Sequence, residues 1–90
     1  MYNVIPSNLY RKDLKLAKKR GLNISLLDDV VDKLARGETL PERHCDHMLQ
    51  GELDGYRECH IKPDWLLIYQ IINNDLILLL SRTGTHSDLF

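Results

Sequence analysis

The hydrophobic pattern of the chain predicts an α+β fold in which an antiparallel sheet packs against a helix hairpin, in β-α-α-β-β-β order. Two segments with helical spacing of apolar residues lie in the first half, and three strand-like runs lie in the second half. Ninety residues with 43% hydrophobic content can close only one core. We therefore expect a single domain over residues 1–90.

The first predicted elements are a strand and a helix. Residues 2–5 are an apolar run that Pro6 interrupts, and Ser7 or Asn8 is a suitable N-cap for the helix that follows. Gly21 is the expected end of this helix. Its expected apolar stripe consists of Leu9, Tyr10, Leu14 and Ala17.

A second helix and a long connection follow. Asn23 or Ser25 can cap the helix, and Gly37 can end it. Residues 38–55 show little periodicity, so we expect an exposed loop, and a loop of that length is unusual without a function. The expected apolar stripe of the second helix consists of Ile24, Leu27, Val31 and Leu34.

The rest of the chain predicts an antiparallel meander. Strand-like runs cover residues 56–61, 65–72 and 76–81, and turn-forming residues separate them at 62–64 and 73–75. The last two runs are almost continuously apolar, which indicates central strands that the helix hairpin covers.

Charge is unevenly distributed, although the net charge is only −1. Residues 1–43 hold nine of the twelve Lys and Arg residues, and six of these lie in residues 11–20 of the first predicted helix. Because the local field guides a polyanionic partner, this basic surface can face phosphate groups. The alternative is a solvated helix face, and charge alone favours that interpretation.

The sequence contains no apolar stretch of the roughly 18 to 20 residues that span a bilayer, and its first residues lack a signal-peptide pattern. We therefore expect a cytoplasmic protein with no membrane partner. Cys45 and Cys59 are too few for the disulfide framework of a small secreted domain, so we expect free thiols.

All four histidines lie in the second half, at His44, His47, His60 and His86, in expected loops or near strand ends. A pair of imidazoles can accept one proton and donate another, as cleavage of RNA through its own 2′-hydroxyl requires, without a cofactor. Any one of these histidines alone is better interpreted as a structural imidazole. The group therefore carries more weight than its members.

A zinc site is the alternative use of the same region, because neighbouring His, Cys and Asp side chains supply suitable donor atoms. The spacing argues against it, since Cys59 and His60 are adjacent in a predicted strand and must point to opposite faces. We expect neither a metal ion nor a cofactor.

Three segments of the second half form a specific pattern: DHMLQG at residues 46–51, GYRECHIKPDWLLIY at residues 55–69 and RTGTHSDLF at residues 82–90. Together they resemble the YafQ type of toxin in the RelE superfamily. The first half fits more loosely, through its strand, its basic helix with KDLKLAKKR at residues 12–20, and its second helix. Three segments that agree in type, order and spacing are far more specific than one short motif.

The resemblance implies a small RelE-like fold and a toxin of a type II toxin–antitoxin system. Such a toxin is an endoribonuclease, or mRNA interferase, that cuts mRNA in the A site of the 70S ribosome and so inhibits translation. A co-expressed antitoxin neutralises it by forming a tight complex with it.

Carried over residue by residue, the acid–base set of the family falls on His47, His60, Asp64 and His86. The expected mechanism is attack by the 2′-hydroxyl with histidine and aspartate as acid and base. His60 or Asp64 is on the base side, His86 is the acid, and His47 is a second proton donor or a phosphate contact. His44 has no counterpart in this set.

Other positions are expected to hold the substrate. Arg82 falls on the basic residue beside the scissile phosphate, where it stabilises the charge of the transition state. Phe90 falls on the C-terminal aromatic residue, which can stack on a base or, alternatively, plug the core. The substrate-binding lysines of the first helix are expected to be Lys15, Lys18 and Lys19.

Two rival functions fit the same fold. A ParE-type toxin of the superfamily binds DNA gyrase and cleaves no RNA, so it has no need of the histidine and aspartate set. An inactive interaction module, whose sheet docks a partner helix, would need only the apolar strands.

Overall fold

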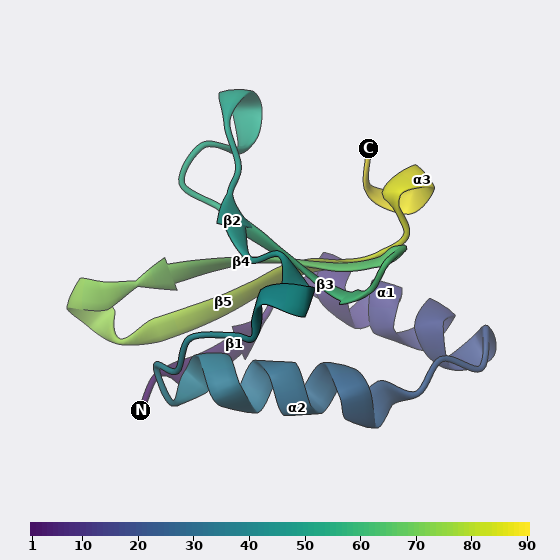
Figure 1. Cartoon of the computed structure of the whole chain (residues 1–90), viewed down its shortest axis with the longest axis horizontal. Helices are drawn as coiled ribbons and strands as arrows, with labels where there is room; N and C mark the ends of the chain where they lie inside the picture. The colour runs from purple at the N-terminus through teal and green to yellow at the C-terminus, as the bar shows by residue number, and fades with distance from the viewer.

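In the computed structural model, which describes residues 1–90, five strands form one sheet in the order β1-β5-β4-β3-β2 (Figure 1). Short 3-10 turns, η1 (Glu42–His44), η2 (Gly51–Leu53) and η3 (Asn73–Asp75), lie in the connections. The main elements are β1 (Asn3–Pro6), α1 (Asn8–Lys19), α2 (Ile24–Ala35), β2 (His47–Met48), β3 (Arg57–Lys62), β4 (Trp65–Ile72), β5 (Ile77–Gly84) and α3 (His86–Leu89). The predicted α+β class is confirmed, with β2 and α3 as additional short elements.

The pairing of β1 differs from the prediction. β3, β4 and β5 form the expected antiparallel meander, but β1 pairs parallel to β5, with Asn3 opposite Ile77 and Pro6 opposite Leu80. The sheet is therefore mixed, and the prediction of a wholly antiparallel sheet is wrong in this strand. The local pattern of a strand does not specify its neighbour, and the long helical connection after β1 permits parallel pairing.

Each predicted helix begins at the first of its two predicted caps. The Ser7 side chain accepts a hydrogen bond from the Tyr10 amide at 3.0 Å, and the Asn23 side chain accepts one from the Ser25 amide at 3.2 Å. Gly21 follows α1 with a φ of 77°, a left-handed conformation that favours glycine. None of the helices is long and apolar enough to cross a membrane.

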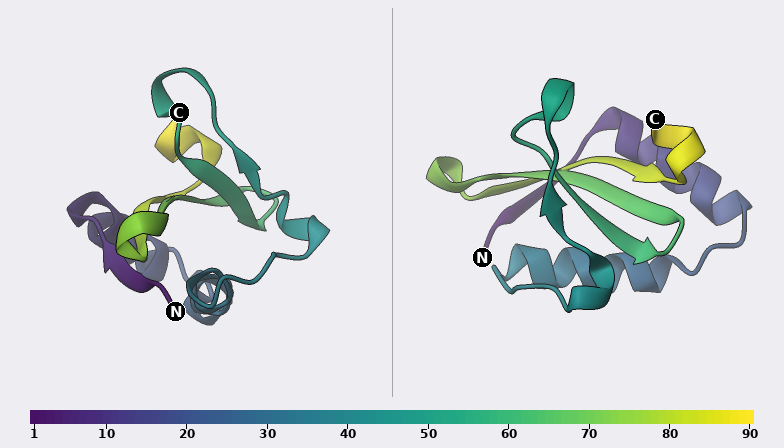
Figure 2. Two further views of the ribbon diagram at one scale, coloured as in Figure 1. Left: turned by 90° about the vertical axis from the view of Figure 1, so that its left-hand side faces the viewer. Right: turned by 45° about the horizontal axis from the view of Figure 1, so that its top comes forward.

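The core lies between α2 and one face of the sheet, and the two views of Figure 2 show α3 and the η2 segment on the other face. Leu9 was expected in the core but is 53% exposed, because Tyr10 and Ala17 already occupy the buried side of α1. The buried side chains of α2 are Leu27, Val30, Val31, Leu34 and Ala35, and those they face on the sheet include Cys59, Ile61, Trp65, Leu67 and Tyr69.

The connection over residues 38–55 is only partly the exposed loop that was expected. Leu40 and His44 are buried, and β2 pairs its His47 with Glu58 of β3. The His44 ring donates from Nδ1 to the carbonyl of His60 at 2.7 Å, which ties η1 to β3. The segment is therefore held against the edge of the sheet, where it can contribute to a site.

Candidate active site

The side chains of β3 alternate between the core and the opposite face of the sheet, because successive residues of a strand point to opposite faces. Cys59 and Ile61 point into the core, whereas Glu58 and His60 point to the face that α2 does not cover. The predicted separation of Cys59 and His60 is thus confirmed. Burial raises the pKa of the Cys59 thiol to about 12, so this thiol stays protonated and unreactive.

Glu58 lies between two of the predicted site histidines. One of its carboxylate oxygens, Oε1, is 3.6 Å from Nε2 of His47 and 3.6 Å from Nε2 of His60, and its side chain is only 8% exposed. Sequence reasoning missed this residue. Two signals pointed to it: strand periodicity places it on the face of His60, and a buried carboxylate requires polar or charged partners.

The other ring nitrogens of these histidines face carbonyl oxygens. Nδ1 of His47 lies 2.6 Å from the Cys45 carbonyl, and Nδ1 of His60 lies 3.2 Å from the Pro63 carbonyl. A carbonyl only accepts, so each Nδ1 carries a proton, and each Nε2 is the nitrogen available for chemistry. Both rings are thereby oriented toward Glu58.

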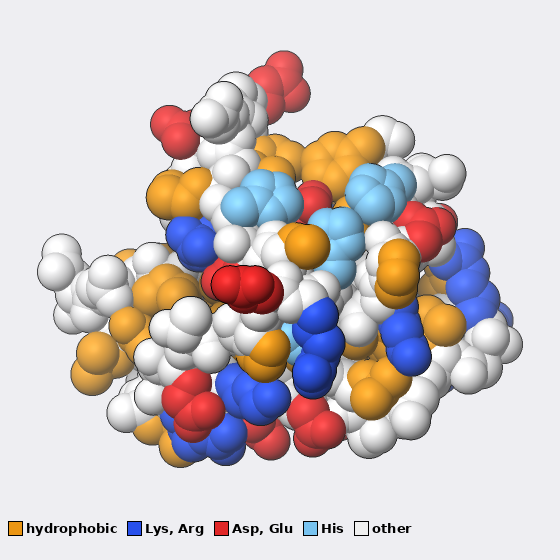
Figure 3. All heavy atoms as spheres, in the orientation of Figure 1, with side chains coloured by type: hydrophobic (Ala, Val, Ile, Leu, Met, Phe, Trp, Pro, Cys, Tyr) orange, Lys and Arg blue, Asp and Glu red, His pale blue; other side chains and the backbone are white.

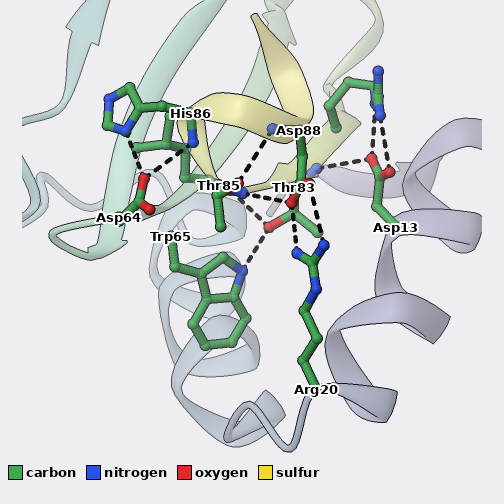
Figure 4. A network of polar contacts seen from close by, with 10 residues as sticks. Asp13, Arg20, Asp64, Trp65, Thr83, Thr85, His86 and Asp88 are labelled. Atoms are coloured by element: carbon green, nitrogen blue, oxygen red, sulfur yellow. Dashed lines mark hydrogen bonds and ion pairs between the residues drawn. The ribbon is translucent and has the colours of Figure 1, made fainter.

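His86 and Asp64 form a second pair, from the start of α3 and the β3–β4 turn (Figure 4). Oδ1 of Asp64 accepts from Nδ1 of the His86 ring at 2.8 Å and from the His86 amide at 3.1 Å. These hydrogen bonds lower the pKa of Asp64 below its usual range. His86 is the first residue of α3 rather than part of a loop, because Thr85 and Asp88 form a capping box there.

The group around Glu58 and the Asp64–His86 pair approach each other through the imidazole rings of His60 and His86. The ring centroids of His60 and His86 are 5.8 Å apart, and histidine side chains gather on one face in Figure 3. The structure thus brings together four predicted residues, and adds Glu58. The set comprises His47, His60, Asp64 and His86.

Helix α3 is anchored to the end of α1. The Arg20 guanidinium binds both carboxylate oxygens of Asp88, at 2.6 and 3.2 Å, and the Thr85 amide donates to Asp88 at 2.9 Å (Figure 4). These contacts hold the pKa of Asp88 well below its usual range, and the hydrogen bond from Arg20 has the largest effect. A Cβ atom at Gly84 would lie 2.9 Å from the same carboxylate, so only glycine leaves room for this anchor.

Arg82 lies on the same face of the sheet as the histidines, but its guanidinium is already bound to a carboxylate. It pairs with Ile68, which pairs with Glu58, so register places it across β4 from the histidines. Its Nε and Nη2 atoms donate to the Asp13 carboxylate of α1 at 2.8 and 3.0 Å. It forms no hydrogen bond or ion pair with the histidines, so the structure does not join it to their group.

The remaining predicted positions contribute no side-chain contact to the group of histidines, although the Phe90 amide donates to the His86 carbonyl at 2.9 Å. Phe90 is 63% exposed, so the alternative of a core plug is wrong. Asp13, Ala17 and Arg20 face β5 and α3, and the 100° step of a helix places the lysines of α1 on the opposite side. These exposed lysines are Lys15, Lys18 and Lys19.

The comparisons with known proteins agree on one family. Residues 2–90 match a family model described as bacterial toxin of type II toxin-antitoxin system, YafQ. The chain is 44% identical over 85 residues to the mRNA interferase toxin YafQ of Escherichia coli K12. This alignment covers 93% of the chain and 90% of the relative.

Two solved structures extend the likeness to the fold. A metal-bound toxin from Helicobacter pylori superposes with a TM-score of 0.95 at 44% identity, covering 100% of both chains. The toxin in the E. coli DinJ-YafQ complex superposes with a TM-score of 0.91 at 37% identity, covering 100% of this chain and 99% of that one.

Proposed function

The chain belongs to the YafQ family of type II toxin–antitoxin toxins, and from this premise we propose that it is an endoribonuclease that cleaves mRNA by histidine and aspartate acid–base catalysis. The observation that carries the proposal is the convergence of His47, His60 and His86, with Glu58 and Asp64, on one face of the sheet. Binding to gyrase would not need this arrangement, which disfavours the ParE-type alternative.

His60 is the proposed general base. Its Nε2 is free of backbone partners and lies beside the Glu58 carboxylate, which stabilises the positive charge that the ring gains when it takes the 2′-hydroxyl proton. Asp64 is less suited to this task, because its Oδ1 atom already accepts two hydrogen bonds from His86. We therefore assign Asp64 to orienting His86.

His86 is the proposed general acid. Asp64 holds its Nδ1, which leaves Nε2 to protonate the departing 5′-oxygen after the 2′-oxygen has attacked the phosphorus. A phosphate bound between the rings of His60 and His86 would have the base on one side and the acid on the other. His47 is the second proton donor or phosphate contact, on the far side of Glu58.

Arg82 and Phe90 complete the proposed substrate site. Two nitrogens of Arg82 are bound by Asp13, so the arginine would share its charge with the phosphorane-like transition state through the remaining donors. Phe90 is exposed beyond α3, where a base could stack on its ring, a contact worth roughly 1 to 3 kcal/mol.

The proposed partners are a cognate antitoxin and the 70S ribosome with its mRNA. The related E. coli toxin was crystallised as a DinJ-YafQ complex, and the same fold over the whole chain supports an equivalent complex here. Primer extension on messages from cells that briefly express the chain tests the function. Cuts within translated codons are expected; intact messages with gyrase-type DNA damage would instead support the ParE-type alternative.

We expect the purified toxin to keep its RNA-cleaving activity in excess EDTA, because two imidazoles and their carboxylates can transfer both protons themselves. The measurement is cleavage of a ribosome-bound message with and without EDTA. The H. pylori relative was crystallised with a metal, so the control is zinc added back after chelation. Activity that EDTA removes and zinc alone restores would contradict the metal-free mechanism.

The lysines of α1 face away from the histidines, and we propose that they bind ribosomal RNA rather than the reacting phosphate. Replacing Lys15, Lys18 and Lys19 together with Glu should weaken 70S association about tenfold or more and make the residual binding less dependent on salt. Sedimentation with ribosomes at several salt concentrations measures both effects. Unchanged binding would mean that these lysines form only a solvated face.

A further inference from the structure

A groove of about 630 Å³ lies between α2, the η1 turn and the β3–β4 turn. Three cationic side chains line it, Lys33 from α2, Arg43 from η1 and Lys62 from the end of β3. Asp29 is the only carboxylate among the lining residues, so the groove carries a net positive charge. We propose that this groove binds the single-stranded message next to the scissile phosphate, an inference that rests on the proposed function.

No carboxylate lies within ion-pair distance of the cations of the groove. Lys33, Arg43 and Lys62 form no ion pair, whereas most other arginines of the chain are held by carboxylates. Unpaired cations in a concave surface attract a polyanion with little competition from the protein itself. The arginines that are engaged in this way are Arg20, Arg36, Arg57 and Arg82.

The groove and the proposed active site share one residue, His60. This residue lines the groove, and its ring also lies against the ring of His86. A strand whose scissile phosphate lies at these rings therefore has a path into the groove for its next nucleotides. On the face drawn in Figure 3, Lys and Arg side chains lie directly below the histidines, along this path.

The wall of the groove is preformed. His44 is 6% exposed, and its hydrogen bond to the His60 carbonyl fixes η1, with Arg43, against β3. The remaining lining is partly apolar, from Leu26, Val30 and Pro63, which suits the faces of unpaired bases between the phosphates. A fixed wall reduces the ordering cost of binding. His44 is thus a structural residue of this groove rather than a member of the catalytic set.

A message strand fits this site better than a segment of antitoxin for two reasons. The cations come from three separate elements, along a path that begins at His60. A single strand carries one phosphate per nucleotide, so cations spaced along a path can each bind a successive phosphate. The lysines of α1, the other basic group of the chain, lie on the side of that helix away from β5 and α3 and do not line this groove. Antitoxin binding is retained as a competing outcome of the test.

The test is fluorescence anisotropy of a labelled 2′-O-methyl oligoribonucleotide, which lacks the nucleophile and stays intact. The variant K33Q/R43Q/K62Q should bind about tenfold more weakly than wild type, with the slope of log affinity against log salt reduced by about 2, since each single-strand phosphate contact contributes roughly 0.7. The matched control compares Arg36→Gln with Arg43→Gln: Arg36 is already paired with Glu38 at 2.6 Å, so its loss should leave the slope unchanged.

The outcomes separate the groove from the function. Equal affinity and slope for wild type and groove variant would overturn the groove and leave the ribonuclease intact, whereas failure of the wild type to cut messages in the primer-extension test would overturn both. A groove variant that binds the oligonucleotide normally but no longer co-purifies with its antitoxin would assign the groove to the antitoxin instead. If the triple variant unfolds, which circular dichroism would reveal, Arg43→Gln alone gives the same comparison with one contact.

Discussion

Replacing His86 with Gln is expected to lower message cleavage by about 10²- to 10⁴-fold, the usual contribution of one positioned proton-transfer group. The glutamine amide can still donate a hydrogen bond to Asp64, but it cannot supply a proton to the departing 5′-oxygen. The His86 side chain is 55% exposed and packs in no core, so the fold should survive the change. Single-turnover cleavage of a ribosome-bound message measures the effect.

A control for His86 lies next to it in the chain. Ser87 is exposed on α3 and its side chain makes no hydrogen bond, so Ser87→Ala should leave cleavage unchanged. Both variants should still co-purify with the antitoxin. Wild-type growth arrest by His86→Gln at equal expression would remove this residue from the mechanism and leave His47 or His60 as the acid.

The lowered pKa of Asp64 keeps its carboxylate ionised, and so paired with His86, at moderately acidic pH. A carboxylate with a depressed pKa contributes its interaction above its unfolded value, and that contribution is lost only as pH falls through the lowered folded value. The Asp64–His86 contact therefore persists at any pH above about 4, the ordinary range for Asp. Loss of activity between neutral pH and that point would therefore not come from loss of the Asp64 charge.

The sequence predicted those parts of the fold that depend on local pattern. Strand β4 was predicted at its observed limits, because Trp65–Ile72 is a continuous apolar run between two turns. For each helix cap one of the two predicted candidates, Ser7 and Asn23, was correct, since capping depends on the next two or three residues. The orientation of β1 was not predictable in this way, because its pairing with β5 joins segments more than 70 residues apart.

The candidate site shows the same division. His47, His60, Asp64 and His86 could be proposed because side chains of that chemistry stand in recognisable segments. Glu58 was missed because a glutamate in a strand usually faces solvent, and only the pairing of β2 with β3 buries it between two imidazoles. The cations of the groove were missed because they are scattered along the sequence, whereas the lysines of α1 form a conspicuous run.

Replacing Glu58 with Gln is expected to lower the cleavage rate about 10²-fold while leaving substrate affinity nearly unchanged. The carboxylate lies within 3.6 Å of Nε2 of both His47 and His60, so its charge stabilises whichever ring becomes protonated during the reaction. A neutral amide of the same shape loses this charge. In catalytic triads the carboxylate that binds the non-reacting ring nitrogen contributes about 10⁴-fold; Glu58 lies beside the reacting Nε2 and at a longer distance, which justifies the smaller expectation.

The measurement that separates Glu58 from a merely structural residue is the split between kcat and KM. Glu58 is a positioning residue, so its loss should lower kcat at constant KM, with an unchanged melting curve, and Glu58→Asp should restore part of the rate by returning the charge. Glu52→Gln is the matched control, since Glu52 is exposed in η2, outside the group of histidines. A Glu58→Gln protein that melts at a lower temperature and cleaves at the wild-type rate would show that the carboxylate only supports the packing of β2 on β3, and His60 would then have to act as base without an electrostatic partner.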